Sequence, residues 1–376
     1  MPLNFSVSQK EFLDAVNSLQ NITSKKGTLA IISNILLESY EKGIVVTGTD
    51  LEVGLKVFVS AEVFSEGSIT LPSKKLFEII RESGSSNIFI EEIDNCWVNI
   101  KSGLSTYNLA GMPSNEFPEF PDFDENGFQS FETYYFLDLI EKCSFSIANE
   151  QENIYSLTSV LFEKEIDQGK SFLKMVSSDG HRLSIIKKEV FKDLDNFHLN
   201  DVTLIPKKGL LEWKKFCEQR DSMEISCEKR QFIIRDDKSV MVIRLKQGEF
   251  PQYNAIVEAV ELTNCLKIKR LPFLESLKRI NIFTEDVFHT IQLKVENQLM
   301  ILSSQNADLG NAKDEITVEY QGEPLVLGFN CRYFIETLQV MEGEVIEAYI
   351  NSNSSPCLMK SESDIGFISI IMPMQL

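Results

Sequence analysis

Hydrophobic residues repeat the same order of patterns three times along this chain of 376 residues. Each copy opens with a short extended stretch that leads into apolar residues at helical spacing. These openings lie at residues 3–7 with a helix around 12–13, at 131 with a helix around 136–137, and at 266–268 with a helix around 273–274. Paired strand-like runs follow, including residues 43–48, 172–178 and 298–304. The pattern predicts three copies of one α+β domain.

The second half of each copy repeats more closely. A strand ends at a breaker, and a helix follows with apolar residues at positions i, i+1 and i+4. The three aligned segments are residues 70–78, 204–212 and 328–336. The first two copies also close with Glu-Phe-Pro, at 116–118 and 249–251, which indicates linkers near 121–129 and 254–264. We therefore expect domains at 1–125, 126–258 and 259–376, each large enough for its own core.

The charge of the chain is acidic, because 37 Lys and Arg against 56 Asp and Glu give a net charge of −19. Taken alone, this balance argues against nucleic-acid binding, since proteins that bind phosphates usually carry a basic excess. The aligned second helices change the picture, because a cation recurs at one position of all three copies. The column contains Lys74, Lys208 and Arg332, each four residues before Glu78, Glu212 and Glu336. The column predicts a shared basic face, and the alternative is that each cation pairs with the glutamate of its own helix.

The composition is ordinary for a globular protein, and we expect a cytoplasmic one. Apolar residues make up 43% and charged residues 25% of the chain. Seven cysteines are spread without CxxC spacing, which favours reduced thiols over disulfides or a zinc site. The first residues contain no basic stretch leading into an apolar run, and no apolar run is long enough to span a membrane.

Five short motifs, in a fixed order on the threefold repeat, resemble those of a known family. They are Gly-Thr-Asp-Leu-Glu at 48–52, Ser-Asp-Gly-His-Arg-Leu at 178–183, Ile-Pro-Lys-Lys-Gly at 205–209, Phe-Pro-Gln-Tyr at 250–253 and Ile-Met-Pro-Met-Gln-Leu at 371–376. The family is the β subunit of bacterial DNA polymerase III, the sliding clamp, and the resemblance covers the whole chain. Each motif alone is weakly specific, whereas the ordered set is highly specific.

The resemblance implies a fold, an assembly and a function. The fold would be α+β, with three tandem clamp-type domains that each pack two helices on antiparallel sheets. Two chains would form a head-to-tail homodimeric ring whose helices line the hole and which encircles duplex DNA without sequence preference. The protein would be a non-catalytic processivity factor without cofactor or metal. Its partners would be the replicative polymerase catalytic subunit, the clamp loader and repair proteins, bound through short peptide motifs, with no membrane contact.

The resemblance also implies a DNA-facing surface on the inside of the ring. The family positions correspond to Lys26, Lys74, Gln151, Tyr155, Lys207 and Lys208. The repeat argument adds Lys25 and Arg332. A closed ring is held on DNA by topology, so few and weak phosphate contacts suffice. Ser156 stands where the family has a second tyrosine, which removes one stacking surface.

A pocket for partner peptides is implied between the second and third domains. The matching positions are Leu157, Ser178, Gly180, His181, Arg182, Leu183, Pro251, Ile256, Ser355, Ile370, Ile371, Met372, Pro373, Met374 and Leu376. Methionine is flexible and polarisable, which suits a surface that accepts several partners. Pro373 is expected to end the last strand, so that Met374 leaves the sheet. Ala255 and Gln375 stand where the family commonly has arginine, so peptide contacts through those cations are lost.

Ring closure is implied between the first domain of one chain and the third domain of the other. Tyr107 and Leu109 on an edge strand would meet Ile282 and Phe283 at a helix end. The sequence alone is equally consistent with four ordinary core residues.

Two other functions remain open from the residues alone. Asp179-Gly180 between two strand-like runs predicts a hairpin, so His181 is either a turn residue or a member of the pocket. A hydrolase using Asp179 and His181 is one alternative, although the chain contains no P-loop, GxSxG, HExxH or dinucleotide fingerprint. An acidic interaction scaffold that does not encircle DNA is the other. Asp50 and Asp179 occupy nearly equivalent repeat positions, but Gln305 stands in the third copy, so no metal site is indicated.

Overall fold

A computed structural model of the chain describes residues 2–23, 30–150, 155–284, 289–306, 310–352 and 354–375. The chain forms two compact units, Met1–Thr133 with Glu212–Leu245 and Tyr134–Leu211 with Lys246–Leu376. The seven helices of the described residues are α1 (Gln9–Leu19), α2 (Ser73–Arg81), α3 (Tyr134–Ser144), α4 (Lys207–Glu218), α5 (Tyr253–Glu258), α6 (Arg270–Asn281) and α7 (Cys331–Val340). Every helix in these ranges is too short or too polar to traverse a lipid bilayer.

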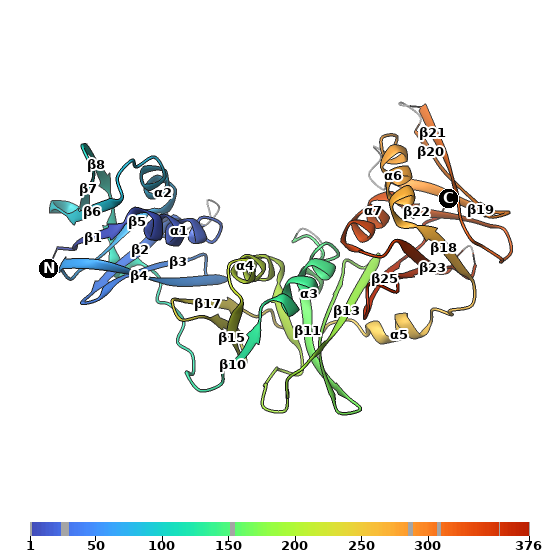
Figure 1. The fold of residues 1–376 in the computed structure, drawn as a ribbon, viewed down its shortest axis with the longest axis horizontal. Coiled ribbons are helices and arrows are strands. Elements are labelled where there is room, and N and C mark those ends of the chain that lie inside the picture. The colour runs from blue at the N-terminus through green and yellow to red at the C-terminus, as the bar shows by residue number, and fades with distance from the viewer. Residues whose placement is uncertain are drawn as a thin grey trace. The chain divides into compact units, whose positions relative to one another are not determined.

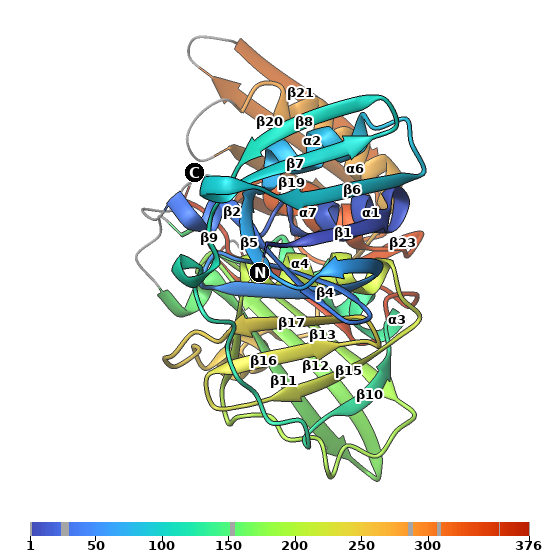
Figure 2. The same cartoon turned by 90° about the vertical axis from the view of Figure 1, so that its left-hand side faces the viewer.

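The first unit contains one antiparallel sheet of thirteen strands in its described residues. They are β1 (Asn4–Ser8), β2 (Asn34–Tyr40), β3 (Gly43–Thr49), β4 (Val53–Ser65), β5 (Ser68–Pro72), β6 (Asn87–Glu92), β7 (Trp97–Ser102), β8 (Ser105–Ala110), β9 (Met112–Pro113), β10 (Gln129–Glu132), β15 (Ser222–Cys227), β16 (Gln231–Arg235) and β17 (Ser239–Arg244). The main path runs β10-β15-β16-β17-β4-β1-β6-β7-β8. Figure 2 shows β6, β7 and β8 side by side, with β8 at the end of this path.

The described residues of the second unit form two antiparallel sheets. Their strands are β11 (Ser159–Asp167), β12 (Lys170–Ser178), β13 (Arg182–Val190), β14 (Thr203–Pro206), β18 (Cys265–Lys269), β19 (Thr290–Glu296), β20 (Leu299–Asn306), β21 (Gly310–Thr317), β22 (Leu325–Asn330), β23 (Val345–Tyr349), β24 (Cys357–Lys360) and β25 (Phe367–Ile371). The larger sheet has the order β14-β11-β12-β13-β25-β24-β23-β18, and the smaller one β21-β20-β19-β22.

The helices other than α5 form where the sequence predicts them, because their apolar residues fall on one face. In α1 the buried residues Phe12, Ala15, Val16 and Leu19 follow the i, i+3, i+4, i+7 spacing of an amphipathic helix. Phe136 and Phe273 occupy the corresponding buried positions of α3 and α6. Figure 1 shows α6 beside α7, where the Phe273 ring lies 5.7 Å from the Phe334 ring in an edge-on contact.

The three-domain fold with two helices on antiparallel sheets is confirmed, but the sheets do not stop at the predicted domain boundaries. β4 of the first repeat pairs with β17 of the second, and β13 of the second pairs with β25 of the third. The two compact units therefore divide the second repeat between them. The boundaries after residues 125 and 258 stay predictions.

The two predicted linkers are ordered segments that pack on these shared sheets. In the first, the Arg235 guanidinium lies 3.6 Å from the Phe128 ring, and just before it the Phe120 ring lies 4.5 Å from the Lys56 Nζ. The second contains a helix that the sequence did not predict, α5, because Tyr253 is buried on the sheet and anchors its first turn.

Candidate partner-binding pocket and nucleic-acid surface

The hairpin between β12 and β13 is held by its own polar side chains. Gly180 has a φ of +89°, a left-handed conformation that favours glycine. The Asp179 Oδ1 accepts hydrogen bonds from the backbone N–H groups of His181 and Arg182, both at 3.0 Å. The Ser178 hydroxyl donates to the Arg182 carbonyl at 2.7 Å and accepts from the Gly180 N–H at 3.1 Å. The predicted hairpin is confirmed, and the backbone of its turn is saturated with short-range hydrogen bonds.

Asp50 performs the same task in the first repeat. Its Oδ1 accepts from the backbone N–H groups of Glu52 at 3.0 Å and Val53 at 2.7 Å. The equivalence of Asp50 and Asp179 therefore reflects a shared turn structure. Within the described ranges, no group of three or more His, Cys, Asp or Glu side chains could hold a metal ion.

The turn is joined to the carboxyl-terminal strand. Leu183 pairs with Ile370 and Arg182 with Ile371 across β13 and β25. The Met372 N–H then donates to the His181 carbonyl at 2.9 Å. Met374 leaves this sheet as the sequence predicted, but its N–H donates to the Gly328 carbonyl of β22 at 2.8 Å. Met372 and Met374 thus tie this segment to both sheets of the second unit, and no pattern in the sequence indicated the second contact.

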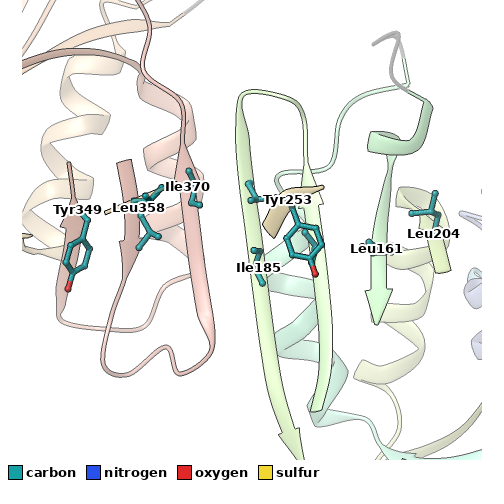
Figure 3. Close-up of a cluster of buried hydrophobic side chains, with 10 residues drawn as sticks. Leu161, Ile185, Leu204, Tyr253, Tyr349, Leu358 and Ile370 are labelled. Carbon is teal, nitrogen blue, oxygen red and sulfur yellow. The ribbon is translucent and has the colours of Figure 1, made fainter. Parts of the chain in front are cut away.

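An apolar cluster lies beneath this seam (Figure 3). Leu183 and Ile185 of β13 are buried with Ile370 of β25, Leu358 of β24 and Tyr349 of β23. Tyr253 of α5 packs on the same cluster, and its hydroxyl donates to the Glu163 carboxylate at 2.6 Å. Two of the predicted pocket residues, Leu183 and Ile370, therefore form a common apolar floor.

The other predicted pocket residues differ in exposure. Met372 is 39% exposed, and Pro373 and Met374 are half-buried, so apolar atoms are accessible beside the buried floor. Ile256 is exposed on α5, whose Val257 packs against the cluster, and Pro251 and His181 are also exposed. Leu157 is buried in the 3₁₀ turn Tyr155–Thr158, and the Ser355 hydroxyl donates to the Ser352 carbonyl at 3.0 Å. Leu376 lies outside the described residues. A buried apolar floor with exposed Met and Ile beside it suits apolar side chains of a ligand.

Arg182, one of the predicted pocket residues, is bound to other parts of the protein. Its side chain is only 7% exposed and forms ion pairs with Asp179, at 2.9 Å, and with Glu336 of α7. The third nitrogen atom of its guanidinium, Nη2, donates to the Phe145 carbonyl at 2.7 Å. Glu336 lies 154 positions along the chain, so no local pattern could have indicated this pair.

The column of cations predicted to face DNA lies on the first turns of three helices. The Lys74 side chain is 64% exposed on α2, and its Nζ lies 3.8 Å from the Glu78 carboxylate. Lys208 lies on α4, and Arg332 is exposed on α7, with its backbone N–H capped by the Asn330 side chain. The alternative reading, in which the cation pairs with the glutamate four residues along the same helix, holds for Lys74 of the first copy. Glu212 pairs with Lys215 at 2.7 Å, and Glu336 pairs with Arg182.

The remaining predicted DNA contacts vary in accessibility. Tyr155 is 63% exposed, with the Lys246 Nζ 4.7 Å from its ring, whereas the Lys207 Nζ donates to the Ile147 carbonyl at 3.2 Å. Lys25, Lys26 and Gln151 lie outside the described residues. A groove of about 770 Å³ between α1 and α2 has a mixed lining that includes the cations Lys74, Lys75 and Arg81 together with Phe77 and Glu78.

The helices differ in charge from the rest of the chain. The six helices other than α5 carry thirteen Lys and Arg against nine Asp and Glu. The remainder of the chain holds the other 24 cations against 47 anions. The basic residues are therefore concentrated on the helices of an otherwise acidic protein.

The four residues predicted at the subunit contact lie at accessible edges. Tyr107 and Leu109 are half-buried on β8, which pairs only with β7 in the described part of the sheet. Ile282 follows α6 and is 65% exposed. Phe283 is half-buried, and its carbonyl accepts a hydrogen bond from the Ser304 hydroxyl at 3.1 Å.

Models of one family match the chain in three consecutive segments. They are the DNA polymerase III beta subunit N-terminal domain at residues 3–121, central domain at 131–252 and C-terminal domain at 260–375. A "Beta sliding clamp" of Chlamydia pneumoniae is 26% identical, covering 100% of this chain and 99% of the relative. One of Haemophilus influenzae is 27% identical, covering 100% of both. The crystal structure of the Bartonella birtlesii sliding clamp bound to griselimycin has a TM-score of 0.92 at 22% identity, covering 100% of both chains.

Proposed function

Since the chain belongs to the family of bacterial DNA polymerase III β subunits, the sliding clamps, it is a non-catalytic processivity factor, and we propose that two copies close head to tail into a ring around duplex DNA. The three domains at 1–125, 126–258 and 259–376 would supply the six segments of this ring. The ring would slide without sequence preference and tether the replicative polymerase, the clamp loader and repair proteins. We also infer that it acts in the cytoplasm.

The observation that carries the DNA proposal is the distribution of charge. The six helices have a basic excess, whereas the rest of the chain has about two anions for each cation. Phosphate contacts are independent of sequence and become weaker as salt concentration rises. A ring needs only weak contacts of this kind, because topology prevents its release, and an acidic exterior disfavours DNA binding outside the ring.

The ring proposal is supported by open sheet edges. β8 and β21 are terminal strands of their sheets among the described residues, so each has one side on which a strand of another copy could pair. The exposed Ile282 and the half-buried Tyr107, Leu109 and Phe283 would supply the apolar part of the contact. A contact between different surfaces of two identical chains closes after two copies if the rotation is 180°.

The pocket proposal assigns partner binding to the seam between β13 and β25. The floor would be formed by Leu183 and Ile370, and the accessible rim by Met372, Pro373 and Met374. Griselimycin, which the Bartonella birtlesii clamp binds, is the probe that we propose for this site. Deleting residues 374–376 should weaken griselimycin binding at least tenfold in calorimetry without changing the sedimentation of the dimer. Unchanged affinity would place the site elsewhere.

Encirclement is tested by retention on a closed circular plasmid after loading by the clamp loader. The wild-type protein should co-elute with the circle in about 0.5 M salt, a concentration at which contacts between exposed charges are screened. It should be released when the circle is cut. The triple variant Lys74→Glu, Lys208→Glu, Arg332→Glu should lose loading or retention. The control reverses three exposed lysines outside the helices, Lys42, Lys170 and Lys229. Release that does not depend on cutting the circle would instead support an acidic scaffold.

A further inference from the structure

The glutamate that recurs in the three second helices has a different partner in the third copy. Glu78 pairs with Lys75 at 2.7 Å and Glu212 with Lys215 at 2.7 Å, so both stay within their own helices. Glu336 instead reaches from α7 to Arg182 at the start of β13. The repeat thus supplies two internal references for a contact that only the third copy makes.

Arg182 contacts two aromatic rings as well as its polar partners. Its guanidinium carbon lies 4.4 Å from the Tyr333 ring and 5.2 Å from the Phe145 ring. The edge of the group donates to Asp179, Glu336 and the Phe145 carbonyl. Such charge-assisted contacts are the strong class of hydrogen bonds in proteins, and stacking on two rings adds to them. These contacts engage all three nitrogen atoms of the guanidinium and so fix its orientation.

The contacts of Arg182 connect α7 to the pocket turn. Asp179, which receives the Arg182 Nε, also caps the backbone N–H groups of His181 and Arg182 through its other oxygen. The His181 carbonyl in turn accepts the N–H of Met372 at 2.9 Å. A continuous chain of contacts therefore runs from Glu336 through Arg182 and Asp179 to the accessible methionine of the carboxyl-terminal strand.

We propose that Glu336 is a positioning residue for the partner pocket: by holding the Arg182 guanidinium against Asp179, it fixes the 178–182 turn on which the Met372 backbone rests. This inference rests on the proposed function of the pocket. Glu336 acts through Arg182 and touches no ligand. Its removal leaves Arg182 with one carboxylate in place of two, and the turn loses the restraint from α7 while its local hydrogen bonds remain.

The test compares Glu336→Gln and Glu336→Ala with the wild type and with Glu78→Gln. Glu78→Gln is the matched control, because it removes the same group from the equivalent helix position of the first repeat, where the ion pairs of the glutamate in the described part of the chain are with Lys74 and Lys75 of α2. The first measurement is amide hydrogen exchange of residues 178–183 and 370–374, which reports local opening without any ligand. The second is calorimetric titration with griselimycin.

We expect both Glu336 variants to raise the exchange rate in the two segments. They should also weaken griselimycin binding about tenfold, a factor typical of losing one charge-assisted contact. The alanine variant should be affected at least as strongly as the glutamine variant. Glu78→Gln should change neither quantity. Unchanged exchange in the Glu336 variants would overturn the inference, and so would raised exchange with unchanged affinity. If the wild type itself fails to bind griselimycin, both the pocket assignment and this inference are refuted. The exchange data would then still show whether Glu336 restrains the turn.

Discussion

Asp364 provides the sharpest test of how the third repeat is held to the second. Its side chain is fully buried and lies between β24 and β25, where its carboxylate is 2.9 Å from the Lys142 Nζ of α3. The same carboxylate accepts the Ser361 hydroxyl and the backbone N–H groups of Glu342 and Gly343 at 3.1 Å. In the variant Lys142 would keep its ion pair with Asp138, at 3.0 Å. The substitution Asp364→Asn removes the charge and keeps the size of the side chain.

The expected loss of stability follows from these contacts. Breaking a buried ion pair by neutralising one partner costs about 3–5 kcal/mol, because the other charge stays buried. Asp138 still balances Lys142, so we place the cost at the lower end, about 3 kcal/mol. For domains of 150–250 residues, 1 kcal/mol corresponds to about 2–4 °C in the unfolding midpoint, which gives a fall of roughly 6–12 °C.

The same carboxylate predicts a dependence on pH. Burial by itself raises the pKa of Asp364, but the hydrogen bonds from Ser361, Lys142 and the two backbone N–H groups outweigh it, so the pKa lies below its ordinary value. A carboxylate with a lowered folded-state pKa stabilises the protein above its unfolded-state pKa, and this contribution is lost as pH falls through the folded-state value. The difference between wild type and Asp364→Asn should therefore shrink as the pH is lowered below the ordinary range of aspartate.

The assay is thermal unfolding followed by circular dichroism, at neutral pH and at a series of acidic values. Asp314→Asn is the control, because Asp314 binds Arg279 at 2.6 Å in a pair whose arginine is 57% exposed. Exposed pairs contribute about 0–1 kcal/mol. Equal losses in the two variants would refute the reasoning, as would a wild-type advantage over Asp364→Asn that persists unchanged in acid.

Three further outcomes are expected. Gly180→Ala places a side chain at a φ of +89° and should lower stability by about 1–2 kcal/mol while weakening griselimycin, and denaturant unfolding with calorimetry measures both; retained stability would show that the turn relaxes freely. Ile282→Asp should convert the dimer to a monomer in sedimentation, whereas Ile365→Asp, at another exposed apolar position, should not. If both variants remained dimers, Ile282 would not lie in the contact between subunits. Burial raises the pKa of the Cys143, Cys217, Cys331 and Cys357 thiols to about 12. Iodoacetamide at pH 8 should therefore leave these four cysteines unmodified in the native protein and modify them after unfolding, which mass spectrometry can count.

Features that depend on neighbouring residues were predictable from the sequence. The spacing of Phe12, Phe136 and Phe273 located the first helix of each repeat, because one face of each helix must be buried. Asp179-Gly180 located a hairpin, because a left-handed residue and an Asp side chain satisfy a tight turn locally. The family motifs located Leu183 and Ile370, which the structure brings together in one apolar floor.

Contacts between distant segments were not predictable. The alternative reading of the aligned helices paired Glu336 with Arg332, yet Glu336 binds Arg182. The repeat alignment could not reveal this partner, because the residue type is the same in all three copies. Lys142 has an i+4 partner in its own helix, Asp138, which concealed its second partner, Asp364. The pairing of β4 with β17 across a repeat boundary was not predictable either, because the apolar pattern of a strand does not identify its neighbour in the sheet.

The strands shared between repeats limit how this protein can be divided. A fragment ending after the first linker would leave β4 without β17, and a fragment beginning at the second linker would leave β25 without β13. Each cut would uncover a row of backbone donors and acceptors together with the apolar side chains beside it, which is the kind of edge that recruits strands from other molecules. We therefore expect single repeats to aggregate on expression, so that the chain, despite its internal repetition, is the smallest piece that can be produced and studied.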